Sequence, residues 1–169
     1  MVTAFAPGKC ILFGEHAVVY GHPAVAVSID SGIEITVEEC ERWEINNQHN
    51  TNKFELFDSK KHPHIQHIIK NLFNYEGKPL RINVQSNLFS GAGLGSSAAL
   101  SNAMGAALHQ FTKPNKELDL IKLSKIGHSA EAATQEGRAS PTDSAASSLG
   151  GCVVVSGKKI DTLTHIFDT

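Results

Sequence analysis

Residues 90–99 read Ser-Gly-Ala-Gly-Leu-Gly-Ser-Ser-Ala-Ala, with glycine at three alternate positions followed by two adjacent hydroxyl residues. Apolar residues then recur at helical spacing: Leu100, Ala103, Met104, Ala107, Leu108 and Phe111. This spacing predicts a helix with one buried face. Before the glycines, Leu80, Ile82 and Val84 alternate with polar residues, which predicts a half-buried strand. The predicted order is strand, glycine-rich loop, helix.

The start of this predicted helix is suited to an anion. Glycines let a ligand approach the backbone closely, and the first helical turn leaves its amides unpaired at the positive end of the helix dipole. No acidic residue occurs from Asn87 to Phe111, although acidic residues are favoured at helix starts. The pattern favours phosphate binding. An ordinary turn, with Ser96 or Ser97 as the N-cap, is the alternative.

The loop matches neither of the two commonest nucleotide-binding motifs. A Walker loop ends in Gly-Lys-Ser/Thr, and residues 90–99 contain no lysine. In the dinucleotide fingerprint GxGxxG the third glycine comes one residue later than Gly95 does here. Both motifs are therefore rejected.

Composition limits the class of protein. The chain has 169 residues, enough for one domain or at most two small ones. A hydrophobic content of 41%, a charged content of 19% and a net charge of −2 describe a soluble globular protein, with no reason to expect nucleic acid or an acidic membrane surface as partner. Apolar runs are too short to span a membrane, and the N-terminus lacks signal-peptide features. Three scattered cysteines argue against a disulfide framework and for the cytoplasm.

The remaining pattern predicts an α+β fold with an antiparallel or mixed sheet. Strands are predicted at residues 2–13 (interrupted by Ala6-Pro-Gly-Lys9), 33–38, 54–57 and 152–155. Helices are predicted at residues 65–73, entered through Pro63, and 116–133, and a loop of small residues at 137–147.

Several polar residues stand in apolar surroundings and are candidates for a site. Lys9, Glu15 and His16 lie in one short stretch, which forms either a polar site or a strand bend with a solvated lysine. Glu131 ends an otherwise apolar helical stripe near the negative end of its helix, so it is either a cation ligand or a solvated side chain. Asp143 is either the N-cap of a short helix or a general base, and a base would need a nearby cation.

Three histidines, His62, His64 and His67, crowd the start of the first predicted helix. Zinc is disfavoured here because neither thiolate nor carboxylate stands at ligand spacing. We expect the three side chains to face solvent.

Three motifs together resemble one family. Residues 6–21 read Ala-Pro-Gly-Lys-Cys-Ile-Leu-Phe-Gly-Glu-His-Ala-Val-Val-Tyr-Gly, residues 91–99 Gly-Ala-Gly-Leu-Gly-Ser-Ser-Ala-Ala, and residues 140–143 Ser-Pro-Thr-Asp. The chain is similar in these motifs to the GHMP small-molecule kinases. Gly-Glu-His followed by Ala-Val-Val-Tyr-Gly resembles the mevalonate kinase branch, particularly its archaeal members, whereas galactokinases continue with Thr-Asp.

The resemblance implies a fold and an activity. The fold is the α+β N-terminal domain of that superfamily, like domain 2 of ribosomal protein S5, spanning residues 1–169, with the C-terminal domain absent. The activity is ATP-dependent phosphorylation of mevalonate to 5-phosphomevalonate, with Mg²⁺ as cofactor. A homodimer is left open.

The resemblance also implies a role for each matched residue. Asp143 matches the base toward the substrate hydroxyl, and Lys9 matches the lysine that keeps this base ionised and neutralises the transferred phosphoryl group. Glu15, His16 and Val19 match the substrate pocket, together with Lys9 and Asp143. Ser97 and Glu131 match the magnesium ligands. The ATP-phosphate loop corresponds to Phe89, Ser90, Gly91, Ala92, Gly93, Leu94, Gly95, Ser96, Ser97, Ala98 and Ala99.

The sequence departs from the family at two points. The loop lacks the proline that usually stands near Phe89 or Ser90, and the chain is shorter than family members, with no second glycine-rich motif after Gly151. Three alternatives stay open. They are a related kinase such as phosphomevalonate kinase, a non-catalytic ligand-binding domain of the same fold, and a half that acts with a second chain. A phosphorylated substrate would call for extra cations, and only Lys9 and Arg138 are obvious.

Overall fold

The longest strand, β2 (Ala24–Glu39), organises the sheet. Along one edge it pairs antiparallel with β1 (Val2–Phe13). Along the other edge its second half pairs with β5 (Leu80–Ser86) and its first half with β6 (Cys152–Ser156), both antiparallel. One long strand thus joins two parts of the sheet that lie far apart in the chain.

Three short strands complete a sheet of seven strands in the described residues. β3 (Glu44–Asn46) runs parallel to β5 and antiparallel to β4 (Glu55–Leu56), and β7 (Lys159–Leu163) runs antiparallel to β6. This computed structural model describes residues 1–47, 53–89, 91–134, 139–157 and 159–163, without the side chain of Val19. The mixed sheet confirms the α+β class expected from the sequence.

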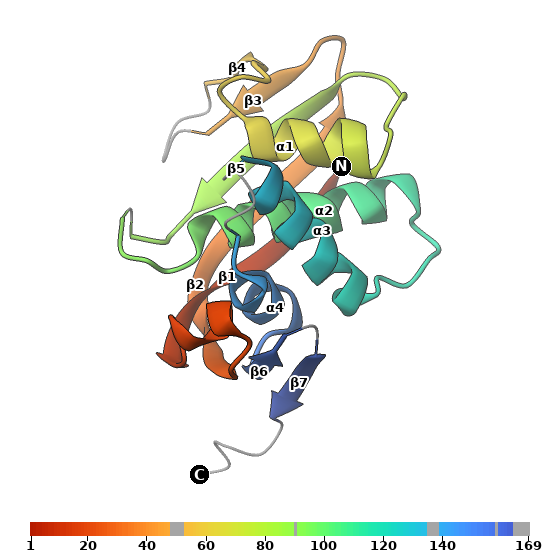
Figure 1. Ribbon diagram of the computed structural model, residues 1–169. Helices are drawn as coiled ribbons and strands as arrows, with labels where there is room; N and C mark the ends of the chain where they lie inside the picture. The colour runs from red at the N-terminus through yellow and green to blue at the C-terminus, as the bar shows by residue number, and fades with distance from the viewer. Residues whose placement is uncertain (48–52, 90, 135–138, 158, 164–169) are drawn as a thin grey trace.

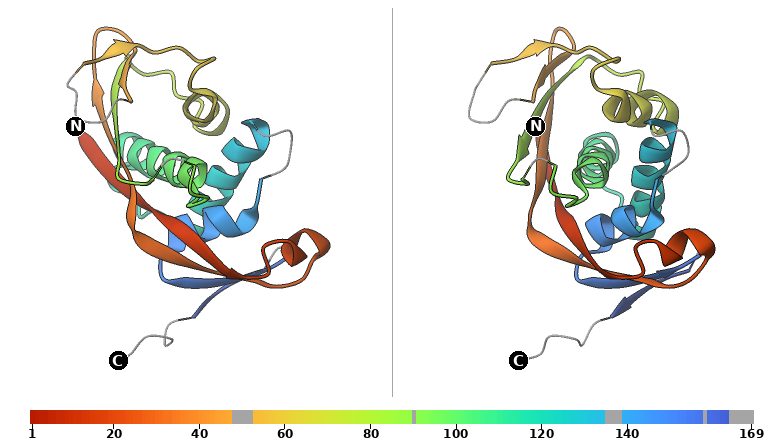
Figure 2. Two further views of the ribbon diagram at one scale, coloured as in Figure 1. Left: turned by 90° about the vertical axis from the view of Figure 1, so that its left-hand side faces the viewer. Right: turned by 60° about the vertical axis from the view of Figure 1, so that its left-hand side comes forward.

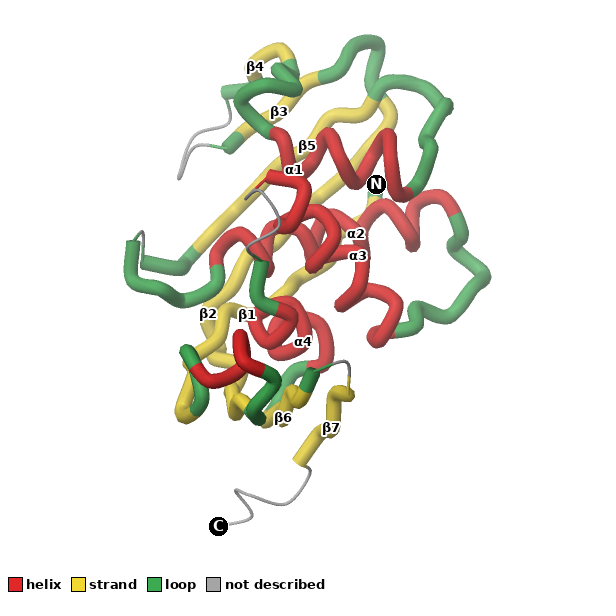
Figure 3. The backbone as a smooth tube through the Cα atoms, in the orientation of Figure 1, coloured by secondary structure: helices red, strands yellow, loops and turns green. Residues whose placement is uncertain are grey.

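The helices cover one face of the curved sheet (Figures 1 and 2). They are the 3-10 turn η1 (Ala17–Tyr20), α1 (Pro63–His67), which continues as the π-helical turn η2 (Ile68–Leu72), α2 (Ser96–Thr112), α3 (Leu120–Thr134) and α4 (Pro141–Leu149). α2 lies against the sheet, and α3 and α4 pack against α2 and against each other (Figure 3). None of the helices described is long and apolar enough to cross a membrane.

The apolar core lies between the sheet and the helices α1 and α2. Side chains of β2 and β5 alternate, so one face of each strand is apolar, and this face meets α1, η2 and α2. Its fully buried members include Ile35, Val37, Ile65, Ile68, Leu80, Ile82, Met104 and Leu108. A smaller cluster under α4 consists of Ala26, Ala145, Ala146, Val153 and Val155.

The predicted helix after the glycine-rich loop is present as α2, but its predicted single buried face is wrong. Residues 98–108 are buried except for Leu100, which is partly buried. The reason is tertiary, since the sheet covers one side of α2 and the helices α3 and α4 cover others. Small residues all around α2 permit these close approaches.

Two predictions in the second half of the chain were wrong. The loop predicted at 137–147 contains helix α4, which Ser140 caps by accepting a hydrogen bond from the Thr142 amide (3.3 Å), with Pro141 in the first turn. Asp143 is therefore not the cap. Helix α3 begins at Leu120 rather than 116, because the Asp119 carboxylate accepts from the Lys122 amide (3.0 Å).

The strands differ in smaller ways from the prediction. β1 is continuous, and the expected interruption is a register shift between Pro7 and Lys9. The first half of β2 and all of β7 were not predicted. Residues 137 and 138 lie outside the described residues, and so does the guanidinium of Arg138.

The three histidines do not simply face solvent, so that expectation was wrong. All three are half-buried. His62 stacks on Phe57 with ring centroids 5.7 Å apart, and His64 Nε2 lies 2.7 Å from Thr134 Oγ1 at the end of α3. Their contacts are those of a helix start packed against its neighbours.

Candidate active site

The glycine-rich loop runs from β5 to α2 and has a backbone that only glycine adopts readily. Gly91, Gly93 and Gly95 have φ values of 73°, 69° and 71°. The N-cap position of α2 is Gly95, which has no side chain to cap the helix, so the alternative of an ordinary turn with a serine cap is wrong. The first turn of α2 contains no acidic residue, and residues 91–93 are exposed. The loop thus leaves free amides at the positive end of a 17-residue helix.

Lys9 connects strand β1 to this loop through two hydrogen bonds. Its backbone amide donates to the Leu94 carbonyl (2.9 Å), and its Nζ donates to the Gly93 carbonyl (3.0 Å). A Cβ at Gly95 would lie 2.9 Å from Lys9 Cγ, so the lysine stem passes directly over this glycine. Lys9 is 6% exposed, which is unusual for a lysine and requires polar partners. The alternative of a solvated Lys9 is therefore wrong.

The buried ammonium of Lys9 also meets helix α4. Lys9 Nζ lies 3.4 Å from Asp143 Oδ1, at ion-pair distance but without hydrogen-bond geometry, and Oδ1 is buried with no hydrogen-bond partner. Burial raises the pKa of Asp143, and the Lys9 charge opposes that rise. Asp143 is thus a carboxylate paired with a buried ammonium, and its affinity for a proton is stronger than usual.

Ser97 and Glu131 form a second cluster beside the first. Ser97 Oγ donates to Glu131 Oε1 (2.5 Å), which joins the start of α2 to the last turns of α3. Glu131 is 3% exposed, so the alternative of a solvated glutamate is wrong. Burial raises the pKa of Glu131, while hydrogen bonds from Ser97 and Ser144 oppose the rise.

The remaining predicted residues are less closely engaged. Glu15 and His16 are exposed in the turn after β1, and neither hydrogen-bonds Lys9 or Asp143 in the described part of the chain. The charge of Glu15 nevertheless contributes to the raised pKa of Asp143. Phe89 is 78% exposed beside the loop. Ser90 and the side chain of Val19 lie outside what the structure describes.

Two buried polar residues of the site escaped the sequence analysis. Ser144 Oγ donates to Glu131 Oε2 (3.0 Å), and Asn102 Nδ2 donates to the Ser144 carbonyl (2.9 Å). Both residues are fully buried. An asparagine inside an alanine-rich helix is a usable signal, because a buried amide requires partners.

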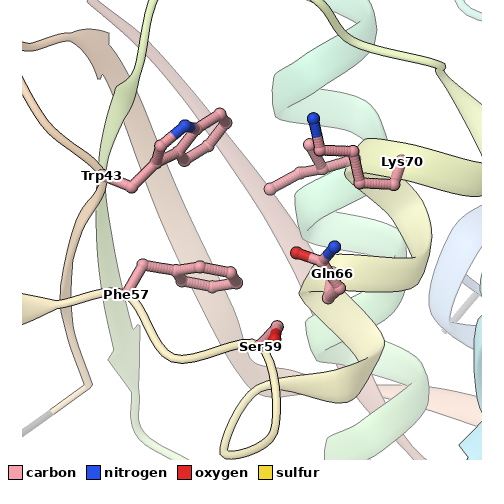
Figure 4. Close-up of a pocket in the computed structure, with 6 residues that line it drawn as sticks. Trp43, Phe57, Ser59, Gln66 and Lys70 are labelled. Carbon is pink, nitrogen blue, oxygen red and sulfur yellow. The ribbon is translucent and has the colours of Figure 1, made fainter.

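A separate cavity lies between the β3–β4 strands and α1–η2, at the end of the molecule opposite to α4 (Figure 1). Its volume is about 250 Å³, and Figure 4 shows Trp43 and Phe57 on one wall facing Gln66 and Lys70. It contains none of the residues that the sequence analysis proposed for the site.

Residues 63–151 match the family described as GHMP kinases N terminal domain, which is more than half of the chain. The chain therefore belongs to the GHMP kinases.

Several proteins similar to this chain are named mevalonate kinases. The chain is 35% identical over 161 residues to the mevalonate kinase of Methanothermobacter thermautotrophicus, covering 93% of this chain and 51% of that protein. It is 35% identical over 151 residues to the mevalonate kinase of Archaeoglobus fulgidus, with coverages of 89% and 51%. The solved mevalonate kinase of Methanococcus jannaschii superposes with a TM-score of 0.80 at 30% identity, over 96% of this chain and 55% of that one. The chain thus spans about half the length of the relatives it matches.

Proposed function

We propose that this chain is the N-terminal, ATP-binding part of a mevalonate kinase, which transfers the γ-phosphoryl group of ATP to the C5 hydroxyl of mevalonate. The observation that carries the proposal is the position of Lys9. Its ammonium contacts both the Gly93 carbonyl of the loop (3.0 Å) and the Asp143 carboxylate (3.4 Å). In this proposal one cation lies between the phosphate-binding loop and the base, where it neutralises charge on the transferred group. The names of the archaeal relatives support mevalonate as the acceptor.

The loop binds the phosphates of ATP in this proposal. The exposed amides of residues 91–93 and the start of α2 offer hydrogen-bond donors and partial positive charge. Lys9 adds a full charge where the γ-phosphoryl group moves. The site therefore acts by positioning and by charge neutralisation.

Asp143 accepts the proton of the attacking alcohol. The alcohol oxygen forms a bond to the γ-phosphorus, the bond to the β–γ bridging oxygen breaks, and ADP leaves. The Asp143 side chain is partly exposed beside Lys9, where an alcohol can approach it, and its raised pKa suits a base. Glu15, His16 and Val19, with Lys9 and Asp143, would form the mevalonate pocket.

Ser97 and Glu131 would hold Mg²⁺. A hydroxyl and a carboxylate 2.5 Å apart are the hard oxygen donors that this ion prefers, and they fit a site completed by water and phosphate oxygens. The described residues contain no group of three or more His, Cys, Asp or Glu side chains at metal-binding distance. A magnesium ion bound together with ATP does not require such a group, because phosphate oxygens and water supply its other ligands. When bound, the ion neutralises charge on the β- and γ-phosphates.

The reducing cytoplasm is the proposed location, because Cys10, Cys40 and Cys152 are free thiols. The proposed partners are small molecules. A net charge of −2 provides no electrostatic basis for nucleic-acid binding.

The test is a phosphorylation assay with a substrate panel. Radiolabelled ATP is incubated with mevalonate or phosphomevalonate, using the chain alone and the chain mixed with the C-terminal half of an archaeal mevalonate kinase. We expect labelled 5-phosphomevalonate from mevalonate in at least the mixed sample. Labelling of phosphomevalonate instead would identify the related kinase. ATP binding without phosphoryl transfer in either sample would support the alternative of a non-catalytic ligand-binding domain.

A further inference from the structure

Ser144 lies next to the proposed base but points to a different partner. It follows Asp143 in α4, so the two side chains project about 100° apart around the helix. Asp143 meets Lys9 of β1, whereas Ser144 Oγ donates to Glu131 Oε2 (3.0 Å) of α3. Adjacent residues of one short helix thus contact the two separate clusters of the site.

Glu131 depends on its hydroxyl donors. Its carboxylate is buried, and a buried carboxylate is strongly unfavourable unless hydrogen bonds or charges compensate for lost water. Ser97 donates to one oxygen and Ser144 to the other, so each oxygen has one donor. If the Ser97 oxygen and Glu131 both bind Mg²⁺, as in the proposed function, the Ser97 hydrogen bond must rearrange. Ser144 is then the donor that remains on Glu131.

The backbone of Ser144 accepts a hydrogen bond from helix α2. Asn102 Nδ2 donates to the Ser144 carbonyl (2.9 Å). A Cβ added at Gly127 would lie 2.1 Å from Asn102 Oδ1, so only glycine at this position of α3 leaves room for the amide. The Asn102 side chain therefore lies between α3 and α4 and holds the α4 backbone at Ser144 in place.

We propose that Ser144 is a positioning residue for the metal site, whose hydroxyl orients the Glu131 carboxylate toward Ser97 and the metal. This inference rests on the proposed function, because it assumes that Glu131 is a metal ligand. Substitutions of hydrogen-bond partners of metal ligands typically weaken metal binding about 10–100-fold.

The experiment measures how strongly Mn²⁺ tightens the binding of AMPPNP, a non-hydrolysable ATP analogue. Calorimetry gives the AMPPNP affinity of the chain in EDTA and in excess Mn²⁺, and electron paramagnetic resonance reports bound Mn²⁺. Ser144→Ala is expected to reduce the Mn²⁺-dependent tightening about tenfold or more, with AMPPNP binding in EDTA unchanged. Ser148→Ala is the matched control, because its hydroxyl lies on the same helix and donates only to the Ala145 carbonyl (3.2 Å).

A double-mutant cycle separates positioning of Glu131 from a general effect on folding. In a Glu131→Gln background, Ser144→Ala should produce little further loss, because the two changes act on one interaction. An undiminished tightening in Ser144→Ala, or an equal loss in the Glu131→Gln background, would overturn the inference while leaving the proposed function intact. If the parent shows no Mn²⁺-dependent tightening, or Glu131→Gln retains it fully, the metal site itself is wrong; this inference and the Mg²⁺ assignment of the proposed function then fail, while the phosphorylation assay tests the kinase activity separately.

Discussion

The interface between the sheet and α2 differs sharply from the junction of α2, α3 and α4. The first is apolar, with buried isoleucine, valine, leucine and methionine from β2, β5, α1 and α2. The second contains Ser97, Asn102, Glu131 and Ser144, joined by hydrogen bonds around Gly127. Apolar burial stabilises a fold without demanding one orientation, whereas hydrogen bonds to buried groups are directional. The comparison indicates that the apolar interface provides stability and the polar junction provides the geometry of the site.

The largest expected effect is on phosphoryl transfer, at the polar side of this comparison. Asp143→Asn removes the proposed base and should lower kcat about 10²–10⁴-fold, with thermal stability and AMPPNP affinity little changed. Initial rates are measured under the conditions in which the parent is active, with Asp161→Asn on the exposed strand β7 as the control. A parallel loss of AMPPNP binding would instead indicate a structural role for Asp143.

A substitution in the apolar interface between the sheet and the helices should lower stability and leave ligand binding unchanged. Ile82 is fully buried between Val37 of β2 and Ile45 of β3. Ile82→Ala should lower the free energy of unfolding by about 2–5 kcal/mol, while the folded protein binds AMPPNP as the parent does. Chemical denaturation measures the change, and Ile121→Ala, at a side chain 40% exposed, is the control. A weakened AMPPNP affinity in folded Ile82→Ala would show that the two regions are not independent.

Gly95 tests the contact between the loop and Lys9. Alanine at a φ of 71° is unfavourable by about 1 kcal/mol, and its Cβ would also displace Lys9. We expect kcat/KM to fall about 10²-fold, as for a small misplacement of a catalytic group. Gly21→Ala is the matched control, because its φ is 84° but no atom lies within 4 Å of the added Cβ. Equal effects of the two variants would remove the argument for a close approach at Gly95.

The smallest effect concerns the pH dependence of stability. The pKa of Glu131 is raised in the folded chain, so the native state holds this proton more tightly than the unfolded state does. Stability from this group is greatest below its ordinary pKa of about 4 and is lost as pH rises through the raised value. In EDTA, Glu131→Gln should therefore gain melting temperature relative to the parent as pH rises from 4 to 8, by a few degrees at most. Exposed Glu117→Gln should show no such trend, and a reversed slope for Glu131→Gln would contradict the assigned direction.

The sequence analysis succeeded where local chemistry dominates. Strand β5, the glycine-rich loop and α2 follow from alternation, glycine and helical spacing, and β6 follows from its apolar run. It failed at α4, whose many serines are weak helix formers. There, the Ser140 cap and the buried surface provided by β1 and β6 override propensity.

By itself, the sequence determined the α+β class, the order of strand, loop and helix, and the family to which the chain belongs. These follow from residue types at short spacings, which act locally. The family resemblance already paired Lys9 with Asp143 and Ser97 with Glu131, and the tertiary structure shows both pairs in contact. Only the tertiary structure decided that Asn102 and Ser144 support the second pair. These contacts join residues far apart in the chain, so they depend on how the sheet and three helices pack, which no local pattern specifies.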